Sequence, residues 1–505
     1  MPRVGGGGPS GELSTSRGVG RTRARDAGHT SLARASARRW APPCIDGGRG
    51  ITAGMRRPFP APFVTALLWG TSLNPLNSSI IATSLVAIAA AFQVGAGQTA
   101  ALVAAVYVAS AVGQPAMGRL AGQFGPRRML VVGLGVVTLA GVIGALAPTF
   151  AWLVVSRALV GIGTAAGYPC AMAIIRTRAD AARTGIPGSV LGGISIASQV
   201  TAALGLPVGG WLTAAWGWPA VFAVNVPLGL IGVGLVLRWV PRDPPRTMRG
   251  GGSLVQALDP AGMALFAAAV ISLIAAISDI RHVSWIALVV FVLSTTALVV
   301  WELRAFAPFI DVRMLRRNGP LVRTYARQAL ALMAAYAVLY GYVQWLEQGR
   351  GLDATTSGLI MLPMSAVAAV GAAVISRDAL IRAPLVVSGV AMLVGGVGIV
   401  LLNAATNVIA LVALSIVFGV VLGMTTTSNQ AALYTQTTAD QIAVASGLAR
   451  TAGYLGAIFA SALIALAFPQ AASDAGMHTI GWVIVGTAVA VLLLVLADPR
   501  VPRRG

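Results

Sequence analysis

The sequence has few charged residues, and it contains no lysine at all. Only 10% of its 505 residues are charged, whereas soluble domains carry about a quarter. So few charges cannot cover a water-facing surface, which excludes an ordinary soluble protein. The lack of lysine excludes a Gly-Lys-Ser/Thr phosphate-binding loop and a lysine Schiff base, and it argues against an ATP-driven pump.

Residues that serve as metal ligands or redox groups are also scarce. The two cysteines, Cys44 and Cys170, lie in a polar N-terminal segment and in an apolar run, so no structural disulfide is expected. The three histidines show no ligand spacing, and we expect neither a metal nor a cofactor. An enzyme would need clustered His, Asp, Glu or Cys at one membrane face, and no such cluster is present.

Long apolar runs are what the sequence has in abundance. Hydrophobic residues make up 56% of the chain, and the mean hydropathy is +0.80. Apolar runs of about 20 residues recur to the C-terminus, which predicts an all-α polytopic membrane protein. We predict fourteen transmembrane helices, at residues 63–85, 99–117, 129–147, 152–174, 190–211, 220–237, 261–277, 285–301, 326–345, 357–375, 385–402, 408–425, 443–468 and 480–496.

The arginines between these runs predict the orientation of the chain. Loops assigned to the cytoplasm hold most of them, whereas the outside loops hold only Arg281 and Arg350. Because arginine-rich short loops stay on the cytoplasmic side, we expect both termini in the cytoplasm and the chain in the plasma or inner membrane. The net charge of +21 then faces anionic lipid headgroups, and no nucleic-acid partner is expected.

The apolar runs fall into blocks of six, two and six. We expect a disordered Arg/Gly-rich cytoplasmic tail at residues 1–57, although translation from Met55 is an alternative. The remaining segments are a first bundle at 58–240, a linker with two extra helices at 241–318, a second bundle at 319–498, and a tail at 499–505. Two repeated bundles are typical of secondary carriers, with the substrate site between them near the midplane.

The loop Gly118–Leu130 reads GRLAGQFGPRRML. It resembles the loop between the second and third spans of the major facilitator superfamily, which reads Gly-x-Leu-Ala-Asp-Arg-x-Gly-Arg-Arg/Lys-x-x-Leu. Gly122 replaces the aspartate of that pattern. The resemblance implies a conformational or gating role for Gly118, Gly125, Arg127 and Arg128.

Further motifs resemble the fourteen-span drug:proton antiporter branch of this family. They are LNPLNSSIIATSL in the first span, SRALVGIGTAAGYP in the fourth, ALGLPVGGWL in the fifth and WGWPAVFAVNVPLG before the sixth. In the fifth span, glycines permit close helix packing and a proline permits bending, and the resemblance implies a gating role for Gly205, Pro207, Gly209 and Gly210. The degenerate VISRDALIRAP adds Arg377 and Asp378 as a candidate pair at the cytoplasmic gate, with a solvated pair as the alternative.

Polar residues inside the apolar runs are the candidates for substrate binding. Asn74, Asn77 and Ser78 share one helix face, and polar groups in lipid normally line a cavity or join two helices. Helix–helix contact is therefore the alternative for these residues. In the second bundle the candidates are Tyr340, Gln344 and Asn429.

Candidates for proton coupling are fewer, because no acidic residue lies between positions 47 and 179. Asn77 stands where the antiporter branch has an acid, and an amide cannot release a proton. Arg157 lies within the fourth span, where the resemblance implies a role in proton transfer; snorkelling to the interface is the alternative. Glu347, on the same helix face as Tyr340 and Gln344, is the remaining titratable candidate; a solvated loop carboxylate is the alternative.

We therefore expect a secondary transporter that exports small amphipathic molecules by alternating access, functions as a monomer and has no enzymatic activity. Proton coupling stays open, with Glu302 and Asp378 as further candidate groups. One alternative is an uncoupled facilitator or an importer of a neutral solute. Another is a transporter-like membrane sensor, which would bind a ligand without flux.

Overall fold

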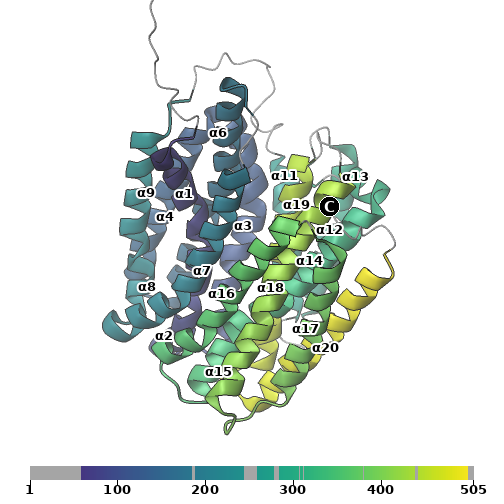
Figure 1. Ribbon diagram of the computed structural model, residues 1–505. Coiled ribbons are helices and arrows are strands. Elements are labelled where there is room, and N and C mark those ends of the chain that lie inside the picture. The colour runs from purple at the N-terminus through teal and green to yellow at the C-terminus, as the bar shows by residue number, and fades with distance from the viewer. Residues whose placement is uncertain are drawn as a thin grey trace, which may run out of the picture. The chain divides into compact units, whose positions relative to one another are not determined.

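The computed structural model describes residues 59–184, 188–243, 259–277, 284–305, 308–310, 312–378, 380–437 and 442–498. The regular elements in these ranges are helices (Figure 1). Those of the first block are α1 (Ala61–Ile80), η1 (Ile81–Ser84), α2 (Leu85–Phe92), α3 (Ala96–Phe124), α4 (Pro126–Ala145), α5 (Phe150–Ala165), α6 (Gly167–Ala181), α7 (Gly188–Trp216), α8 (Pro219–Ala223) and α9 (Asn225–Trp239). The others are α11 (Pro260–Ile277), α12 (Trp285–Arg304), α13 (Val312–Arg317), α14 (Gly319–Ala337), η2 (Val338–Tyr342), α15 (Val343–Gln348), α16 (Ala354–Asp378), α17 (Arg382–Val400), α18 (Val408–Gln436), α19 (Ile442–Ala467) and α20 (Asp474–Leu496).

Each predicted apolar run coincides with helix. Among the described residues, 12 helical segments are long and apolar enough to cross a membrane. Helix α7, with 29 residues, covers the fifth predicted span, and α11 covers the seventh with a shorter apolar stretch, Pro260–Ala276. The chain is thus a multi-pass helical membrane protein with 12 to 14 candidate spans.

Several spans are interrupted, which the apolar pattern did not predict. The first span runs as α1, the 3₁₀ turn η1 and α2, and the ninth runs as α14, the π-helical turn η2 and α15. In the first span the N–H of Ile81 bonds to the carbonyl of Ser79. The Asn77 carbonyl, which an unbroken α-helix would pair with Ile81, is thereby left for another donor.

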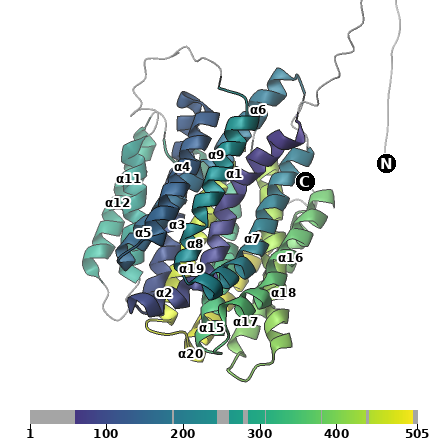
Figure 2. The same ribbon diagram turned by 90° about the vertical axis from the view of Figure 1, so that its left-hand side faces the viewer.

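Close helix contacts link the first block to the helices α14–α20, which we call the second block. Helix α7 packs on α1 in the first block and on α16 in the second, and α3 packs on α19. Helix α11 packs on α3 and α19, and it pairs with α12 at one side of the bundle (Figure 2). The largest group of buried apolar side chains includes residues of both blocks, so the hydrophobic core is continuous between them.

We call the helix ends that carry Arg127, Arg178 and Arg316 the arginine-rich end; it lies at the top of Figure 1, near the labels α6 and α13. The opposite end carries α2 and α15. Arg323, which precedes the predicted ninth span at 326–345, lies inside α14. The proposed tail at 1–57, most of the linker and the tail at 499–505 fall outside the described residues, as do the side chains of Arg377 and Asp378.

Candidate functional site

A group of buried polar side chains lies where α1, α3, α5 and η2 meet. We call it the central polar cluster; it consists of Asn74, Asn77, Ser78, Tyr107, Arg157 and Tyr340. Four helical elements from both blocks contribute to it. Five of these six residues were predicted from the sequence; Tyr107 was not.

Arg157 on α5 is the cation of the cluster, and only 2% of its surface is exposed. Its Nε donates to the carbonyl of Leu102 at 3.3 Å, and its Nη1 donates to the carbonyl of Asn77 at 3.3 Å. The break of α1 at Ile81 explains why the second carbonyl is available. Nη2 is buried and has no hydrogen-bond partner. Because the whole side chain is buried, snorkelling to the interface is not its role.

The two asparagines of α1 bond to side chains of other helices. Nδ2 of Asn77 donates to Oδ1 of Asn225 at 2.7 Å, and that of Asn74 donates to Oγ1 of Thr164 at 2.9 Å. Asn77 is buried, whereas Asn74 is half-buried. Asn77 therefore acts as a link between α1 and α9, and Asn74 is the more accessible of the two.

Tyr340 on the π-helical turn joins the two blocks. Its hydroxyl donates to the carbonyl of Ser78 at 3.0 Å and lies 2.8 Å from the hydroxyl of Tyr107. Since the single proton of Tyr340 goes to Ser78, Tyr107 is the donor in the second bond. The predicted residue Gln344 lies four positions further along the chain, and its Nε2 donates to the Tyr340 carbonyl at 3.3 Å.

More aromatic residues continue this contact toward the arginine-rich end. Tyr107 on α3 packs against Tyr454 on α19, with ring centroids 5.7 Å apart, and Nε2 of Gln114 donates to the Tyr454 hydroxyl at 2.7 Å. Cζ of Arg450 on α19 lies 3.5 Å from the ring centroid of Tyr168 on α6. Each of these contacts joins one block to the other.

Two of the predicted site residues lie away from the cluster. Oδ1 of Asn429 accepts from Nε of Arg327 at 3.4 Å, about 20 Å along α14 from Tyr340 by helix rise. Arg327 is fully buried, and its Nη1 lies 3.5 Å from Oδ2 of Asp498. Glu347 lies two turns from Tyr340 toward the opposite end; it is half-buried, and its Oε1 has no hydrogen-bond partner.

The predicted gating loop is anchored by an acid that the sequence analysis did not identify. The carboxylate of Asp243, which follows α9, accepts the N–H of Arg127 and of Arg128, both at 3.1 Å. These N–H groups open α4, where helices have unsatisfied donors and positive potential. Gly125 has a φ of +100°, and a Cβ there would clash with the Asp243 carboxylate. Gly118 is less constrained, since the nearest atom to a Cβ there would be 3.6 Å away.

The predicted glycines of α7 permit close contact on two sides. A Cβ at Gly205 would lie 2.6 Å from Cβ of Ser79, and one at Gly209 would clash with the carbonyl of Ile80, both in the first block. A Cβ at Gly210 would clash with the carbonyl of Ala354 in the second block. Helix α7, which contains Pro207, therefore packs closely on its own block and on the second block.

The α11–α12 hairpin carries two further buried acids. Both carboxylates lie within 3 Å of the position that a Cβ of Gly262 would take, so Asp259 and Glu302 are close neighbours. Asp259 accepts from Nε1 of Trp301 at 2.7 Å, whereas neither oxygen of Glu302 has a hydrogen-bond partner.

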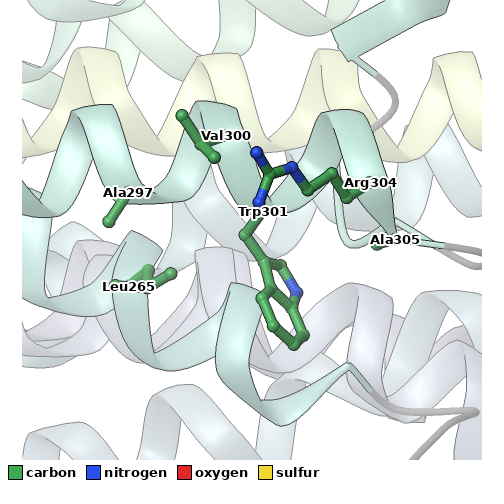
Figure 3. Close-up of a pocket in the computed structure, with 6 residues that line it drawn as sticks. All are labelled: Leu265, Ala297, Val300, Trp301, Arg304 and Ala305. Carbon is green, nitrogen blue, oxygen red and sulfur yellow. The ribbon is translucent and has the colours of Figure 1, made fainter.

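A pocket of about 400 Å³ lies on this hairpin, lined by residues of α11 and α12 and the position after α12 (Figure 3): Leu265, Ala297, Val300, Trp301, Arg304 and Ala305. None of these residues belongs to the central polar cluster.

Comparison with known proteins agrees with this architecture. The model of the family described as Major Facilitator Superfamily matches residues 67–461. The chain is 30% identical over 441 residues to the uncharacterised MFS-type transporter YwoD of Bacillus subtilis, covering 86% of this chain and 96% of YwoD. It is 28% identical to the multidrug efflux pump LfrA of Mycolicibacterium smegmatis, over 84% of each chain.

Among solved structures, a D-xylose–proton symporter superimposes with a TM-score of 0.61, covering 88% of this chain and 98% of the symporter at 16% identity. That likeness shows a shared fold. The relatives are consistent with the drug:proton antiporter branch, and the chain is a transporter rather than an enzyme. The chain belongs to the major facilitator superfamily.

Proposed function

We propose that this transporter exports small amphipathic molecules by alternating access across the inner membrane. It does so as a monomer with fourteen spans and with both termini in the cytoplasm. The N-terminal bundle of residues 58–240 and the C-terminal bundle of 319–498 move against each other, and 241–318 connects them. The export direction is supported by relatives such as LfrA, which is named a multidrug efflux pump.

The observation that carries this proposal is the uneven packing of the two blocks. Near the opposite end, a Cβ at Gly97 on α3 would lie 2.9 Å from the carbonyl of Ala465 on α19. Toward the arginine-rich end of the same two helices, a Cβ at Gly122 or at Gly447 would meet no atom within 4 Å. Close glycine packing near the opposite end, with none at these two positions near the arginine-rich end, fits one of the two states that alternating access requires.

For the energy source, we propose that Glu347 binds the coupled proton. Arg157 keeps the central polar cluster in the arrangement that changes when Glu347 takes up or releases this proton. Glu347 is half-buried with an unpartnered oxygen, on the same continuous segment as Tyr340. A half-buried carboxyl with a free oxygen can accept a proton and release it again, which suits a coupling group. Its neighbour Asp353 is exposed, and hydrogen bonds from the Thr356 hydroxyl and N–H hold its pKa below the usual range.

A resistance assay and a flux assay test these proposals. Expression in a host that lacks its own efflux pumps should raise the tolerated concentration of several amphipathic toxins at least about fourfold. Everted vesicles should then accumulate such a compound faster when the vesicle interior is more acidic than the medium. Glu347→Gln should abolish the effect of the gradient, while Asp353→Asn should leave it intact. Unaltered toxin tolerance for every compound would rule out export.

One observation favours an uncoupled carrier as the second candidate. Among the described residues, no carboxylate contacts the central polar cluster, and Asn77 occupies the position where the antiporter branch has an acid. An uncoupled facilitator equilibrates its solute at the same rate with and without a pH gradient. The vesicle assay separates the two, since gradient-independent equilibration would remove the antiporter proposal.

A further inference from the structure

Tyrosines are concentrated where the two blocks meet. Five of the eight in the chain belong to one continuous group, formed by Tyr107, Tyr168, Tyr336, Tyr340 and Tyr454. Their side chains provide flat aromatic surfaces, and the hydroxyls of Tyr340 and Tyr454 lie in hydrogen bonds between the blocks. Such a surface suits a planar aromatic ligand, because aromatic rings attract each other in stacked and edge-on arrangements.

The charge at this group is entirely positive. Arg450 lies over the ring of Tyr168, and Arg157 has Tyr340 and Tyr107 as its ionisable neighbours. Within the described part of the chain, no carboxylate forms an ion pair with either arginine; the ion pairs found there join Arg323 and Arg327 to Asp498. Charges inside a membrane protein normally pair with one another or with backbone carbonyls. Arg157 has two such carbonyls, whereas in the described part of the chain Arg450 has neither a carboxylate nor a carbonyl, so Arg450 leaves an anion to be supplied.

The two arginines differ in how available they are. Arg157 is fully buried, and two of its nitrogens are bonded to backbone carbonyls. Arg450 is half-buried, and it contacts the Tyr168 ring and the Tyr454 hydroxyl. A guanidinium leaves an aromatic face readily for a carboxylate, because a charge-assisted bidentate pair is stronger than a cation–π contact. Tyr168 and Tyr336 are half-buried as well, so the accessible side of the group contains both a cation and aromatic rings.

We infer that the substrate is a small organic anion with an aromatic ring, whose anionic group binds Arg450 and whose ring packs among Tyr168, Tyr336 and Tyr454. This inference rests on the proposed transport function and names the substrate class for it. Cationic amphiphiles are disfavoured, because Arg157 and Arg450 raise the local potential in a medium that screens charge poorly. The anionic group is either a carboxylate or a sulfonate, since both offer oxygen acceptors to the guanidinium.

Two dyes with the same fused ring system and opposite charge test the inference. Purified protein in lipid nanodiscs is titrated into fluorescein, an anion, or rhodamine 123, a cation, and fluorescence polarisation reports binding; empty nanodiscs give the background. Fluorescein should bind at least about tenfold more tightly, and 2-naphthoate should compete with it. Arg450→Gln should weaken fluorescein binding about tenfold, as expected for a lost hydrogen-bonded charge. The matched variant Arg316→Gln, at an exposed arginine, should leave it unchanged.

A second variant and a flux assay separate the possible failures. Tyr168→Leu, which removes a ring and keeps both arginines, should weaken competition by 2-naphthoate. The inference would be overturned by any of three results. These are equal or tighter binding of rhodamine 123, no binding of either anion, and fluorescein binding that Arg450→Gln leaves unaltered. Flux of both dyes is measured separately in proteoliposomes. Binding of fluorescein without flux of any dye would contradict the proposed transport function and support the anion site. Flux of rhodamine 123 alone would support transport and contradict the anion site.

Discussion

At the scale of single residues, the geometry of Arg157 matters as much as its charge. The guanidinium reaches carbonyls on two different helices, Leu102 on α3 and Asn77 on α1, with two nitrogens of one planar group. A lysine has the same charge, but its single ammonium on a flexible chain cannot match a planar fork. The residue is therefore a structural bridge between α1 and α3 as well as a source of positive potential.

We predict that Arg157→Lys retains a folded protein and loses most of the transport activity, roughly tenfold, because one ammonium cannot satisfy both carbonyls. Arg157→Ala should lose activity completely and also lower thermal stability, since two buried carbonyls lose their donors. The measurements are toxin tolerance in cells and thermal unfolding of the purified protein. Arg316→Lys, at an exposed position, is the control. Unchanged tolerance with Arg157→Ala would remove this residue from the site.

The hydroxyl pair of Tyr107 and Tyr340 gives a second residue-scale prediction. Replacing either by phenylalanine removes the bond between them, so the double variant should cost less than the two single ones together. We expect a coupling free energy of unfolding of about 1 kcal/mol, typical of one buried hydrogen bond. The control cycle pairs Tyr107→Phe with Tyr342→Phe, whose hydroxyl donates to Leu411 instead. Additive single effects in the first cycle would show that this bond contributes nothing.

At the scale of elements, polar residues inside apolar runs predicted most of the central polar cluster. Asn74, Asn77, Ser78 and Arg157 were identified because burying an unpaired polar group in lipid is costly, and each of the four takes part in a hydrogen bond to another helix. Tyr107, Tyr168 and Tyr454 gave no such signal, because tyrosine is common in apolar helices and its role depends on the facing helix.

The same limit applies to helix breaks and loop anchors. The turns η1 and η2 interrupt apolar runs whose sequence is compatible with a continuous helix, so only the packing of neighbouring helices reveals them. Asp243 lies more than a hundred residues from the loop that it anchors. Gly122 stands where the family pattern has an aspartate, so the loop itself contains no acid. Asp243, which binds Arg127 and Arg128 in its place, could therefore be found only from the structure.

The anchoring of α4 leads to a prediction at this scale. Asp243→Ala should lower the free energy of unfolding by about 1 kcal/mol, the usual cost of losing an N-terminal helix cap, and Asp243→Asn by less. Gly125→Ala should be worse than either, since its φ is strained for alanine and its Cβ would displace the carboxylate. Thermal unfolding in detergent measures all three. Asp180→Ala removes an exposed acid near the same end and should have no effect; equal losses for Asp180 and Asp243 would contradict the capping role.

At the scale of the whole molecule, the arrangement of the blocks and the orientation in the membrane can be tested together. The packing of Gly97 on Ala465 closes α3 against α19 at the opposite end, whereas Gly122 and Gly447 have free space around them. If the arginine-rich end faces the cytoplasm, a reagent that enters from that side reaches these two glycines, and one that enters from outside does not.

We therefore predict that Gly122→Cys and Gly447→Cys react with a membrane-impermeant maleimide in everted vesicles and stay unlabelled in intact cells. The experiment uses a background with Cys44→Ser and Cys170→Ala, and a cysteine at Gly351, which lies at the opposite end between α15 and α16, serves as the control with the reverse pattern. A labelled Gly351→Cys also proves that the reagent had access to the outer face. Labelling of Gly122→Cys in intact cells would overturn the proposed orientation, and labelling of Gly447→Cys from neither side would show that the two blocks close at the arginine-rich end as well.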